Sequence, residues 1–406
     1  MKIVFMFEAF TKNMGYLGNM LPKYLARLGA DVHVVTTNLP YYYSINDFNK
    51  TYGEFIDSTS LSSATVEKYD GYTLHILPHQ KIFGYVQMIG WWDKLKEIRP
   101  DIVQALPAIG WIPLNAALAQ PFLAYKLFTA SHTTASVFPL AKRQVSMLDK
   151  EFIINQLARG IPGRFVSLFT EKCYAATIDC ADVAERFFGV EKNKIDICPL
   201  GVDTEVFKPL SSDEEYVKKS ILRQKMGFSE EEIVCIYTGR FSNDKNPLLL
   251  AKAIDKLSKL GENIRGLFVG NGTQAEEIQS CSGCIIHPFV PVHELGDFFR
   301  CADIGVWPTQ ESTSMIDAAA CGLPIVVNNT LAAVERIEGN GLTYKLNDLD
   351  DLVSVLYSLK DVKIREKLGS VGAEKIANNY SWYSLSKSRL NDYEASIIKK
   401  SNKSKV

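Results

Sequence analysis

The chain has 406 residues, of which 47% are hydrophobic and 22% are charged, and its formal net charge is -1. This length accommodates two or three domains with cores of their own, and the composition is ordinary for a globular protein. A net charge near zero gives no electrostatic reason to expect nucleic acid as the main partner. No run of about 18 apolar residues occurs, so we expect no transmembrane helix.

The N-terminus and the cysteines indicate a reducing compartment. The first residues, MKIVFMFEAF, are too short an apolar run and too soon acidic for a signal peptide, and predict a strand instead. The 8 cysteines are scattered, mostly in apolar runs where buried thiols are common. Cys281 and Cys284 lie near His287, but a structural zinc site needs four ligands and no second pair is evident. We therefore expect a cytoplasmic protein without a structural metal.

The chain opens with the pattern of a βαβ unit. A strand is predicted for residues 2–7, a helix for 20–28 and a second strand for 32–36. The first loop contains Gly15 and Gly18, where backbone can approach a phosphate closely. There is no GxGxxG pattern followed by an acidic residue at ribose distance, which disfavours a pyridine-nucleotide oxidoreductase.

Two later features of this half have more than one interpretation. His132 directly follows a strand predicted at 128–131, and an isolated histidine at such a place is usually structural. Residues 142–169 combine apolar residues near helical spacing with interleaved lysines and arginines. A basic amphipathic helix can lie on an anionic membrane, but most amphipathic helices pack on their own core, and we favour the second interpretation.

A main domain boundary is predicted near residue 203. An apolar strand ends in the stretch 198–209, which reads CPLGVDTEVFKP, and the acidic run 211–215 then supplies a linker.

The second half opens with a strand at 234–237, followed by TGRFSNDKNP and a helix at 247–260. Arg240 and Lys245 place two cations after Gly239 and before the helix N-terminus, which suits a pyrophosphate. The alternative is a pair of solvated surface charges, the usual state of lysine and arginine.

The stretch 307–327, WPTQESTSMIDAAACGLPIVV, predicts a further strand, a polar loop, a helix and another strand. Gly322 and Pro324 end the helix as a C-terminal glycine and a following proline do. Free amides at the helix start can face an anion, and the carboxylates of Glu311 and Asp317 can accept hydrogen bonds from sugar hydroxyls. Ordinary helix capping explains the same residues equally well.

This stretch resembles the signature of the retaining glycosyltransferases of the large GT4 family. The run Asp317 to Pro324, DAAACGLP, is similar to the family's Glu-Ala-x-Ala-Cys-Gly-x-Pro pattern, with Asp in place of Glu. Only five residues separate Glu311 from Asp317 where the family has seven, so the loop is two residues shorter. The stretch 198–209 and the Gly-Arg…Lys pattern at Arg240 and Lys245 are similar to the family as well. The resemblance covers almost the whole chain.

The resemblance implies the GT-B fold, an α/β architecture of two Rossmann-like doubly wound domains that face each other across a cleft. The acceptor-side domain would comprise residues 1–203 and be completed by a C-terminal helix at 381–399. The nucleotide-sugar domain would comprise 204–380. We expect the basic end, 400–406, to be disordered.

The resemblance also implies the residues of the site. The catalytic residues would be His132, Arg240, Lys245 and Glu311. Contacts with the donor would come from Gly15, Gly18, Gly239, Arg240, Lys245, Gly270, Gly272, Phe289, Val290, Glu311, Ser312, Thr313, Ser314, Met315 and Asp317.

The implied reaction moves a sugar, of the hexosyl type, from a nucleotide-diphosphate sugar to a hydroxyl acceptor, with retention of anomeric configuration. The acceptor would be a glycan, a glycolipid or a small molecule. Arg240, Lys245 and amides at the helix start would stabilise the leaving phosphate, so neither a metal nor a cofactor is expected. Two alternatives share the fold: a sugar-nucleotide epimerase, whose acid/base carboxylates we do not locate, and a non-catalytic binding subunit.

Several GT4 enzymes that build glycolipids touch membranes through the N-terminal domain. The resemblance therefore keeps the membrane interpretation of residues 142–169 open. In that case the protein would lie peripherally at the inner face of the membrane.

Overall fold

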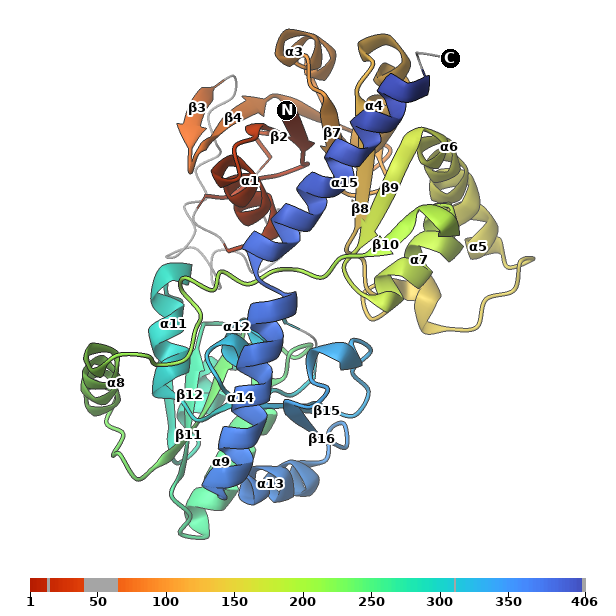
Figure 1. Ribbon diagram of the computed structural model, residues 1–406. Helices are drawn as coiled ribbons and strands as arrows, with labels where there is room; N and C mark the ends of the chain where they lie inside the picture. Colours follow the sequence, from red (N-terminus) through yellow and green to blue (C-terminus); the bar gives the residue numbers. More distant parts are fainter. Residues whose placement is uncertain (13–14, 40–64, 310–311, 404–406) are drawn as a thin grey trace.

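The structure is a computed structural model that describes residues 1–12, 15–39, 65–309 and 312–403. It has an α/β architecture with two parallel-type sheets, one in each half of the chain. Figure 1 shows the two halves one above the other, with the long helix α15 (Trp382–Lys403) running along the upper one. The predicted arrangement of two Rossmann-like domains is confirmed.

The first domain is built on an eight-stranded sheet in which only the edge strand β3 runs antiparallel to its neighbour. Both faces of the sheet are covered: in β1, Ile3 and Phe5 pack in one core cluster and Val4 and Met6 in another. A strand buried on both faces must be apolar throughout, which is why its sequence does not alternate. In sheet order the strands are β10 (Ile195–Ile197), β9 (Thr170–Ala175), β8 (Lys126–Ser131), β7 (Ile102–Ala105), β1 (Lys2–Met6), β2 (Asp31–Thr37), β4 (Tyr72–Leu77) and β3 (Val66–Tyr69).

Helices cover the two faces of this sheet. Helices α1 and α15 contribute to the core that contains Ile3, whereas α3, α4 and α6 contribute to the core that contains Val4. A two-stranded hairpin, β5 (His79–Ile82) and β6 (Tyr85–Met88), stands apart from the main sheet. Besides α15, the helices of this domain are α1 (Leu17–Arg27), α3 (Trp91–Ile98), α4 (Trp111–Leu123), α5 (Lys150–Asn155), α6 (Ile161–Phe169) and α7 (Ile178–Phe188).

The second domain is built on a six-stranded sheet in which every pairing is parallel. In sheet order its strands are β13 (Cys284–His287), β12 (Ile264–Val269), β11 (Ile233–Thr238), β14 (Ile304–Trp307), β15 (Ile325–Asn328) and β16 (Gly341–Tyr344). Its helices are α8 (Asp213–Lys225), α9 (Pro247–Lys259), α10 (Ala275–Gln279), α11 (Val292–Cys301), α12 (Ser314–Ala320), α13 (Leu349–Ser358) and α14 (Val362–Asn379). One continuous hydrophobic core joins them.

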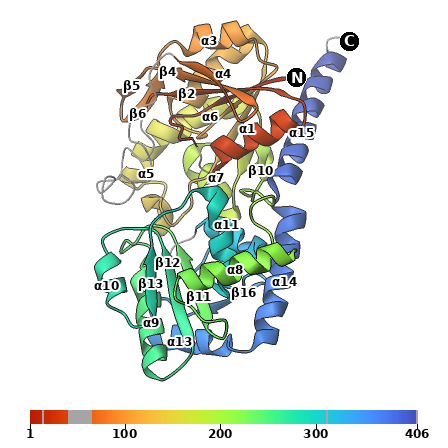
Figure 2. The ribbon, with the colours of Figure 1, turned by 90° about the vertical axis from the view of Figure 1, so that its left-hand side faces the viewer.

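The chain passes between the domains twice, and the two crossings lie side by side. The amide of Val202 donates to the Tyr380 carbonyl (2.7 Å), and the amide of Trp382 donates back to the Val202 carbonyl (3.0 Å). After this point α15 returns to the first domain, where the rings of Tyr393 and Phe128 lie 4.8 Å apart. Figures 1 and 2 show the same return from two directions. We propose 1–203 and 204–380 as the limits of the two domains, with α15 completing the first.

The end of the chain and the segment 142–169 differ from what the sequence predicts. Helix α15 continues to Lys403, so the expected disorder does not begin at residue 400, and residues 404–406 lie outside the described part. In the segment 142–169 the helix begins only at Lys150, and a π-helical turn at Gln156–Gly160 joins α5 to α6.

The expectation that the segment 142–169 packs on its own core is only half right. Val145 and Phe152 pack against a core cluster, but the side chains of Leu148 and Leu157 are 87% and 63% exposed. Leu148 lies in a turn before α5, and Leu157 lies in the π-turn, whose extra residue shifts the helical register. No helix of the described residues, in this segment or outside it, has both the length and the apolar character needed to cross a bilayer.

Candidate active site

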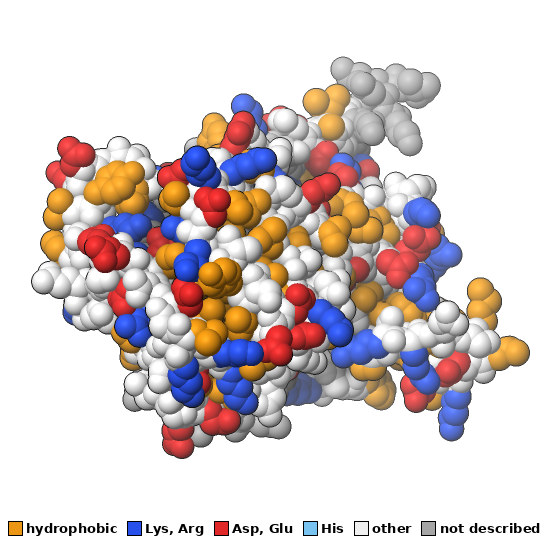
Figure 3. All heavy atoms as spheres, turned by 90° about the horizontal axis from the view of Figure 1, so that it is seen from below, with side chains coloured by type: hydrophobic (Ala, Val, Ile, Leu, Met, Phe, Trp, Pro, Cys, Tyr) orange, Lys and Arg blue, Asp and Glu red, His pale blue; other side chains and the backbone are white. Residues whose placement is uncertain are grey.

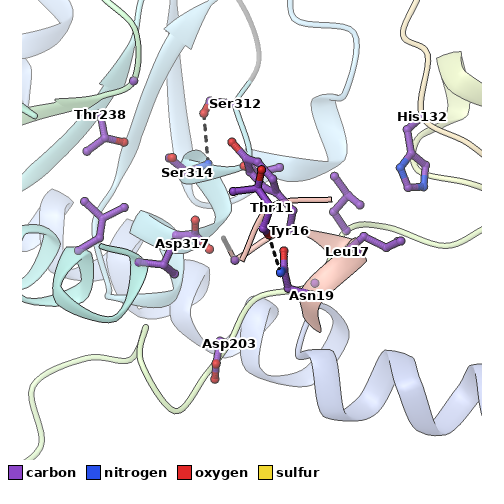
Figure 4. A pocket seen from close by; sticks show the side chains of 18 of the residues that line it. Thr11, Tyr16, Leu17, Asn19, His132, Asp203, Thr238, Ser312, Ser314 and Asp317 are labelled. Carbon is purple, nitrogen blue, oxygen red and sulfur yellow. Dashed lines mark hydrogen bonds between the residues drawn. The ribbon is translucent and has the colours of Figure 1, made fainter. Parts of the chain in front are cut away.

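A cavity of about 850 Å³ lies between the two domains. Its walls are formed by loops that follow β1 and β8 in the first domain and β11, β13 and β14 in the second. Ligands of open α/β sheets bind at the carboxyl ends of the strands, and here two such edges face each other. Figure 4 shows residues from both domains around this space, with Asp317 and Thr238 on one side and His132 on the other.

The loop after β11 carries two cations into the cavity. Arg240 follows Gly239, whose φ of +142° is a conformation that favours glycine, and Lys245 lies just before α9. Arg240 is paired with Asp244 at 3.3 Å. Burial acts to raise the pKa of Asp244, but a hydrogen bond with Ser242 and the charges of Arg240 and Lys245 outweigh it, so the pKa is lowered. The two cations therefore act on the same small region.

Gly270 and Gly272 support this loop from behind and do not line the cavity. Both have φ of +152°. A Cβ on Gly270 would lie 1.9 Å from the Gly239 carbonyl oxygen, and a Cβ on Gly272 would lie 2.6 Å from that of Phe241. Only glycine permits the loop after β12 to approach the Arg240 loop this closely. Their predicted contact with the donor stays a prediction, and the structure shows them packed against the Arg240 loop.

The loop after β14 brings hydroxyls and a carboxylate to the same wall. Ser312, Thr313, Ser314 and Asp317 all line the cavity, and the Ser312 hydroxyl accepts a hydrogen bond from the Ser314 amide (3.2 Å; Figure 4). Burial, and secondarily the negative charge of Asp203, raises the pKa of Asp317 well above its usual range. A buried carboxyl of this kind gains from a ligand that donates hydrogen bonds to it.

Four more of the predicted residues of the second domain need separate mention. Glu311 lies outside the described residues. Met315 is buried in the core and does not line the cavity, because its position in α12 (Ser314–Ala320) faces the sheet. The family resemblance also implied donor contacts from Phe289 and Val290, and both line the cavity after β13.

The first domain contributes the opposite wall. Gly15 and Gly18 line the cavity, and a Cβ on Gly15 would lie 2.9 Å from Val292 of α11, so the first loop touches the second domain. His132 follows β8 and also lines the cavity. Burial, together with the positive charge of Arg389, lowers the pKa of His132 to about 4. The imidazole is therefore neutral at physiological pH and able to exchange hydrogen bonds with a ligand.

Sequence reasoning missed several residues that line the cavity, among them Glu8, Asp203 and Trp382. Glu8 lies two residues after the end of β1, and the rule that ligands bind at the carboxyl ends of strands was enough to single it out. Asp203 lies in the interdomain stretch, where its carboxylate accepts from the Tyr24 hydroxyl (2.8 Å) and stays beside the cavity. Trp382 reaches the site only because α15 returns to the first domain.

The described residues offer no group of three or more His, Cys, Asp or Glu side chains arranged to hold a metal ion. In particular, Cys281 and Cys284 do not form such a group with His287, and both thiols are free.

Two facing Rossmann-like domains with a cavity between their carboxyl edges define the GT-B class of glycosyltransferase folds. Residues 232–361 match the family model described as Glycosyl transferases group 1. This stretch contains β11 with its Arg240 loop and the loop that leads to Asp317. The resemblance found in the sequence is confirmed, and the match lies within the second domain.

Relatives with curated names agree with this assignment. The chain is 29% identical over 237 residues to a D-inositol 3-phosphate glycosyltransferase of Paenarthrobacter aurescens, covering 53% of this chain and 55% of the relative. The chain thus spans about half the length of that relative. A protein of the same name from Kribbella flavida is 23% identical over 354 residues, covering 81% of this chain and 79% of the relative.

Solved structures confirm the fold. A sucrose-phosphate synthase from Thermosynechococcus elongatus aligns with a TM-score of 0.67 at 14% identity, covering 98% of this chain and 99% of that chain. Anabaena HepE in complex with UDP aligns with a TM-score of 0.68 at 14% identity, covering 97% and 100%. At this level of identity the likeness establishes the fold alone.

Proposed function

We propose that the protein is a glycosyltransferase that moves a sugar from a nucleotide-diphosphate sugar to a hydroxyl acceptor, with retention of configuration and without a metal. The observation that carries this proposal is the arrangement of one cavity. Arg240, Lys245 and Asp317 lie on its second-domain wall, and neutral His132 lies on its first-domain wall. Structures similar in fold include HepE in complexes with UDP and with UDP-glucose, which supports a nucleotide-sugar donor.

The chemistry follows from where charge develops. When the bond between sugar and diphosphate breaks, negative charge grows on the leaving phosphate. Two fixed cations on the loop after β11 stabilise that charge without reorganising, and so accelerate bond cleavage. In this proposal Asp317 accepts hydrogen bonds from the ribose, and His132 hydrogen-bonds the transferred sugar. The acceptor hydroxyl enters between the sugar and the first domain.

A panel of UDP-, GDP- and ADP-sugars in a thermal-shift assay identifies the donor, because a ligand that binds only the folded state raises the melting temperature. Transfer to candidate acceptors is then followed by mass spectrometry, with the anomeric configuration of the product read by NMR. Activity retained after EDTA treatment supports metal independence. A donor epimerised without transfer would indicate the epimerase, and binding without hydrolysis or transfer would indicate the binding subunit.

We also propose that the face around α5 rests on an anionic membrane surface. The segment 142–169 has five basic and two acidic residues, a net charge of +3. Its exposed apolar side chains are Met147, Leu148, Ile153, Ile154, Leu157, Ile161 and Leu168. Figure 3 shows hydrophobic side chains standing out at the edge of the molecule that carries α5 in Figure 1. Exposed apolar residues among cations are the composition of interfacial helices.

Sedimentation with vesicles of phosphatidylserine and phosphatidylcholine tests this surface. Binding should fall as salt rises, because the attraction between surface charges is screened. The double variant Leu148→Asp, Leu157→Asp should abolish binding, whereas Ile221→Asp on α8, which replaces an equally exposed apolar residue of the other domain, should not. No binding of the wild type at low salt would refute the membrane contact.

A further inference from the structure

The two walls of the cavity differ in charge. Among the described residues that line it, the cations are Arg240 and Lys245, and both belong to the second domain. The first-domain wall and the adjoining interdomain stretch contribute two anions, Glu8 and Asp203. His132 adds no positive charge there, since its pKa is lowered to about 4. Among the described residues, the cations are therefore confined to the side of the cleft where the diphosphate binds, which also carries Asp317, whereas the side where an acceptor enters carries carboxylates and no cation.

Glu8 is held at this wall by local structure. It lies two residues after the end of β1, and its carbonyl accepts a hydrogen bond from the Thr37 hydroxyl. A Cβ on Gly110 would lie 3.7 Å from a carboxylate oxygen of Glu8 and 3.1 Å from the ring of Tyr85, so this carboxylate lies close to Gly110 and Tyr85. The hydrogen bond from Thr37 thus fixes the backbone position from which the carboxylate of Glu8 extends.

The carboxylate of Glu8 lacks hydrogen-bond donors, which a ligand can supply. Burial raises its pKa to about 7. Phe7, Phe10 and Pro107 line the same cavity and offer it no hydrogen bond. Within the described part of the chain, no group donates a hydrogen bond to this carboxylate. A buried carboxylate without donors gains from hydroxyls and repels anions.

Three other cations of the first domain have partners of their own and do not line the cavity, although the positive charge of Arg389 acts on His132. Arg159 donates to the Tyr85 hydroxyl (2.6 Å). Arg389 donates to Gln104 (3.2 Å) and to the Cys198 sulfur (2.8 Å). Lys12 is paired with Glu67 at 2.8 Å. None of the three lines the cavity.

We propose that the acceptor is a hydroxyl compound that carries no phosphate on the part that enters the cleft, and that Glu8 binds it by accepting hydrogen bonds from its hydroxyls. The apolar residues beside Glu8 suit the face of a sugar or polyol ring. A phosphate ester would instead meet Glu8 and Asp203 and find no cation among the described residues of this wall. The inference rests on the proposed glycosyltransferase function, and it separates this chain from the relatives whose name specifies inositol 3-phosphate.

The test uses isothermal titration calorimetry on the full chain saturated with UDP, so that the basic wall is already occupied. Inositol 3-phosphate is the probe. We expect no measurable binding to the wild type, and binding that appears in Glu8→Lys and, more weakly, in Glu8→Gln. Removing one nearby negative charge should tighten binding by about 10-fold, and reversing it by about 100-fold. Glu97→Lys makes the same charge change on exposed α3 and should behave like the wild type.

The outcomes separate the two proposals. If UDP and the other nucleotides fail to bind, the glycosyltransferase function is refuted. If UDP binds and the wild type also binds inositol 3-phosphate at submillimolar concentration, only the acceptor inference is refuted. A Glu8→Lys protein that melts cooperatively, binds UDP normally and shows no gain for the phosphate ester refutes the placement of Glu8 in the acceptor site. The conservative Glu8→Gln variant provides the same comparison if the lysine is not tolerated.

Discussion

Gly270→Ala should disable nucleotide binding although Gly270 touches no part of the cavity. The new Cβ would lie 1.9 Å from the Gly239 carbonyl oxygen, whereas carbon and oxygen need about 3.3 Å. The Arg240 loop must therefore move by roughly 1.4 Å. A shift of this size breaks the charged hydrogen bond from Arg240 to the diphosphate, worth about 1.5–3 kcal/mol, or about 10–150-fold in Kd. The φ of +152° adds backbone strain of about 1–3 kcal/mol for a residue other than glycine.

The assay is calorimetric titration with whichever nucleoside diphosphate the donor panel selects, together with thermal melting. Gly261→Ala is the matched control: its φ is +82° and its new Cβ would meet nothing within 4 Å. The control should lose about 1–2 kcal/mol of stability from the left-handed backbone and keep its nucleotide affinity. Wild-type affinity in Gly270→Ala, or an equal loss in the control, would show that the Arg240 loop is not positioned in this way.

Three further predictions concern residues of the second half of the chain. Arg240→Ala and Lys245→Ala should each weaken nucleoside diphosphate binding by about 1.5–3 kcal/mol, measured by titration; unchanged affinity in both would refute the phosphate clamp. Asp317→Asn should weaken nucleotide binding with or without its sugar, yet raise the melting temperature of the free protein. The pKa of Asp317 is raised in the folded state, so ionising it opposes folding increasingly as pH rises above the unfolded pKa of about 4. The rise in melting temperature caused by Asp317→Asn should therefore be larger at pH 7 than at pH 4. An equal rise at both pH values would contradict the assignment. Glu311→Ala should slow transfer from, or weaken binding of, the sugar-bearing donor only, and an equal loss of free nucleotide affinity would refute that division of roles.

The parts of the fold that depend on local pattern were predictable. Runs such as Ile3 to Met6 and Val234 to Tyr237 are apolar throughout because parallel strands are buried on both faces. Once the strands are known, the loop that carries Arg240 and Lys245 must lie at the carboxyl edge of its sheet, because it follows the carboxyl end of a strand. The same logic places His132 and Asp317 at the edges of their sheets.

Residue roles that depend on the approach of distant segments were not predictable in the same way. Gly270 was expected to touch the donor, but it faces the Gly239 carbonyl, a contact set by how closely two neighbouring loops pack. Leu148 is exposed in a turn before α5, and Leu157 is exposed within a π-turn, and no periodicity in the sequence marks either irregularity. Met315 lies in the predicted helix, yet its burial follows from which face of α12 meets the sheet.

The sequence by itself therefore determined the two doubly wound domains, the order of their elements and the loops that carry charged residues, because hydrophobic periodicity and turn residues act over a few positions. Only the tertiary structure decided which of those loops face one cavity. It placed the carboxylate of Glu8 on the opposite wall from the cations of Arg240 and Lys245, and it brought Trp382 back to the site from the end of the chain. These relations join residues hundreds of positions apart, and they exist only once the packed cores and the two adjoining crossings hold the domains face to face.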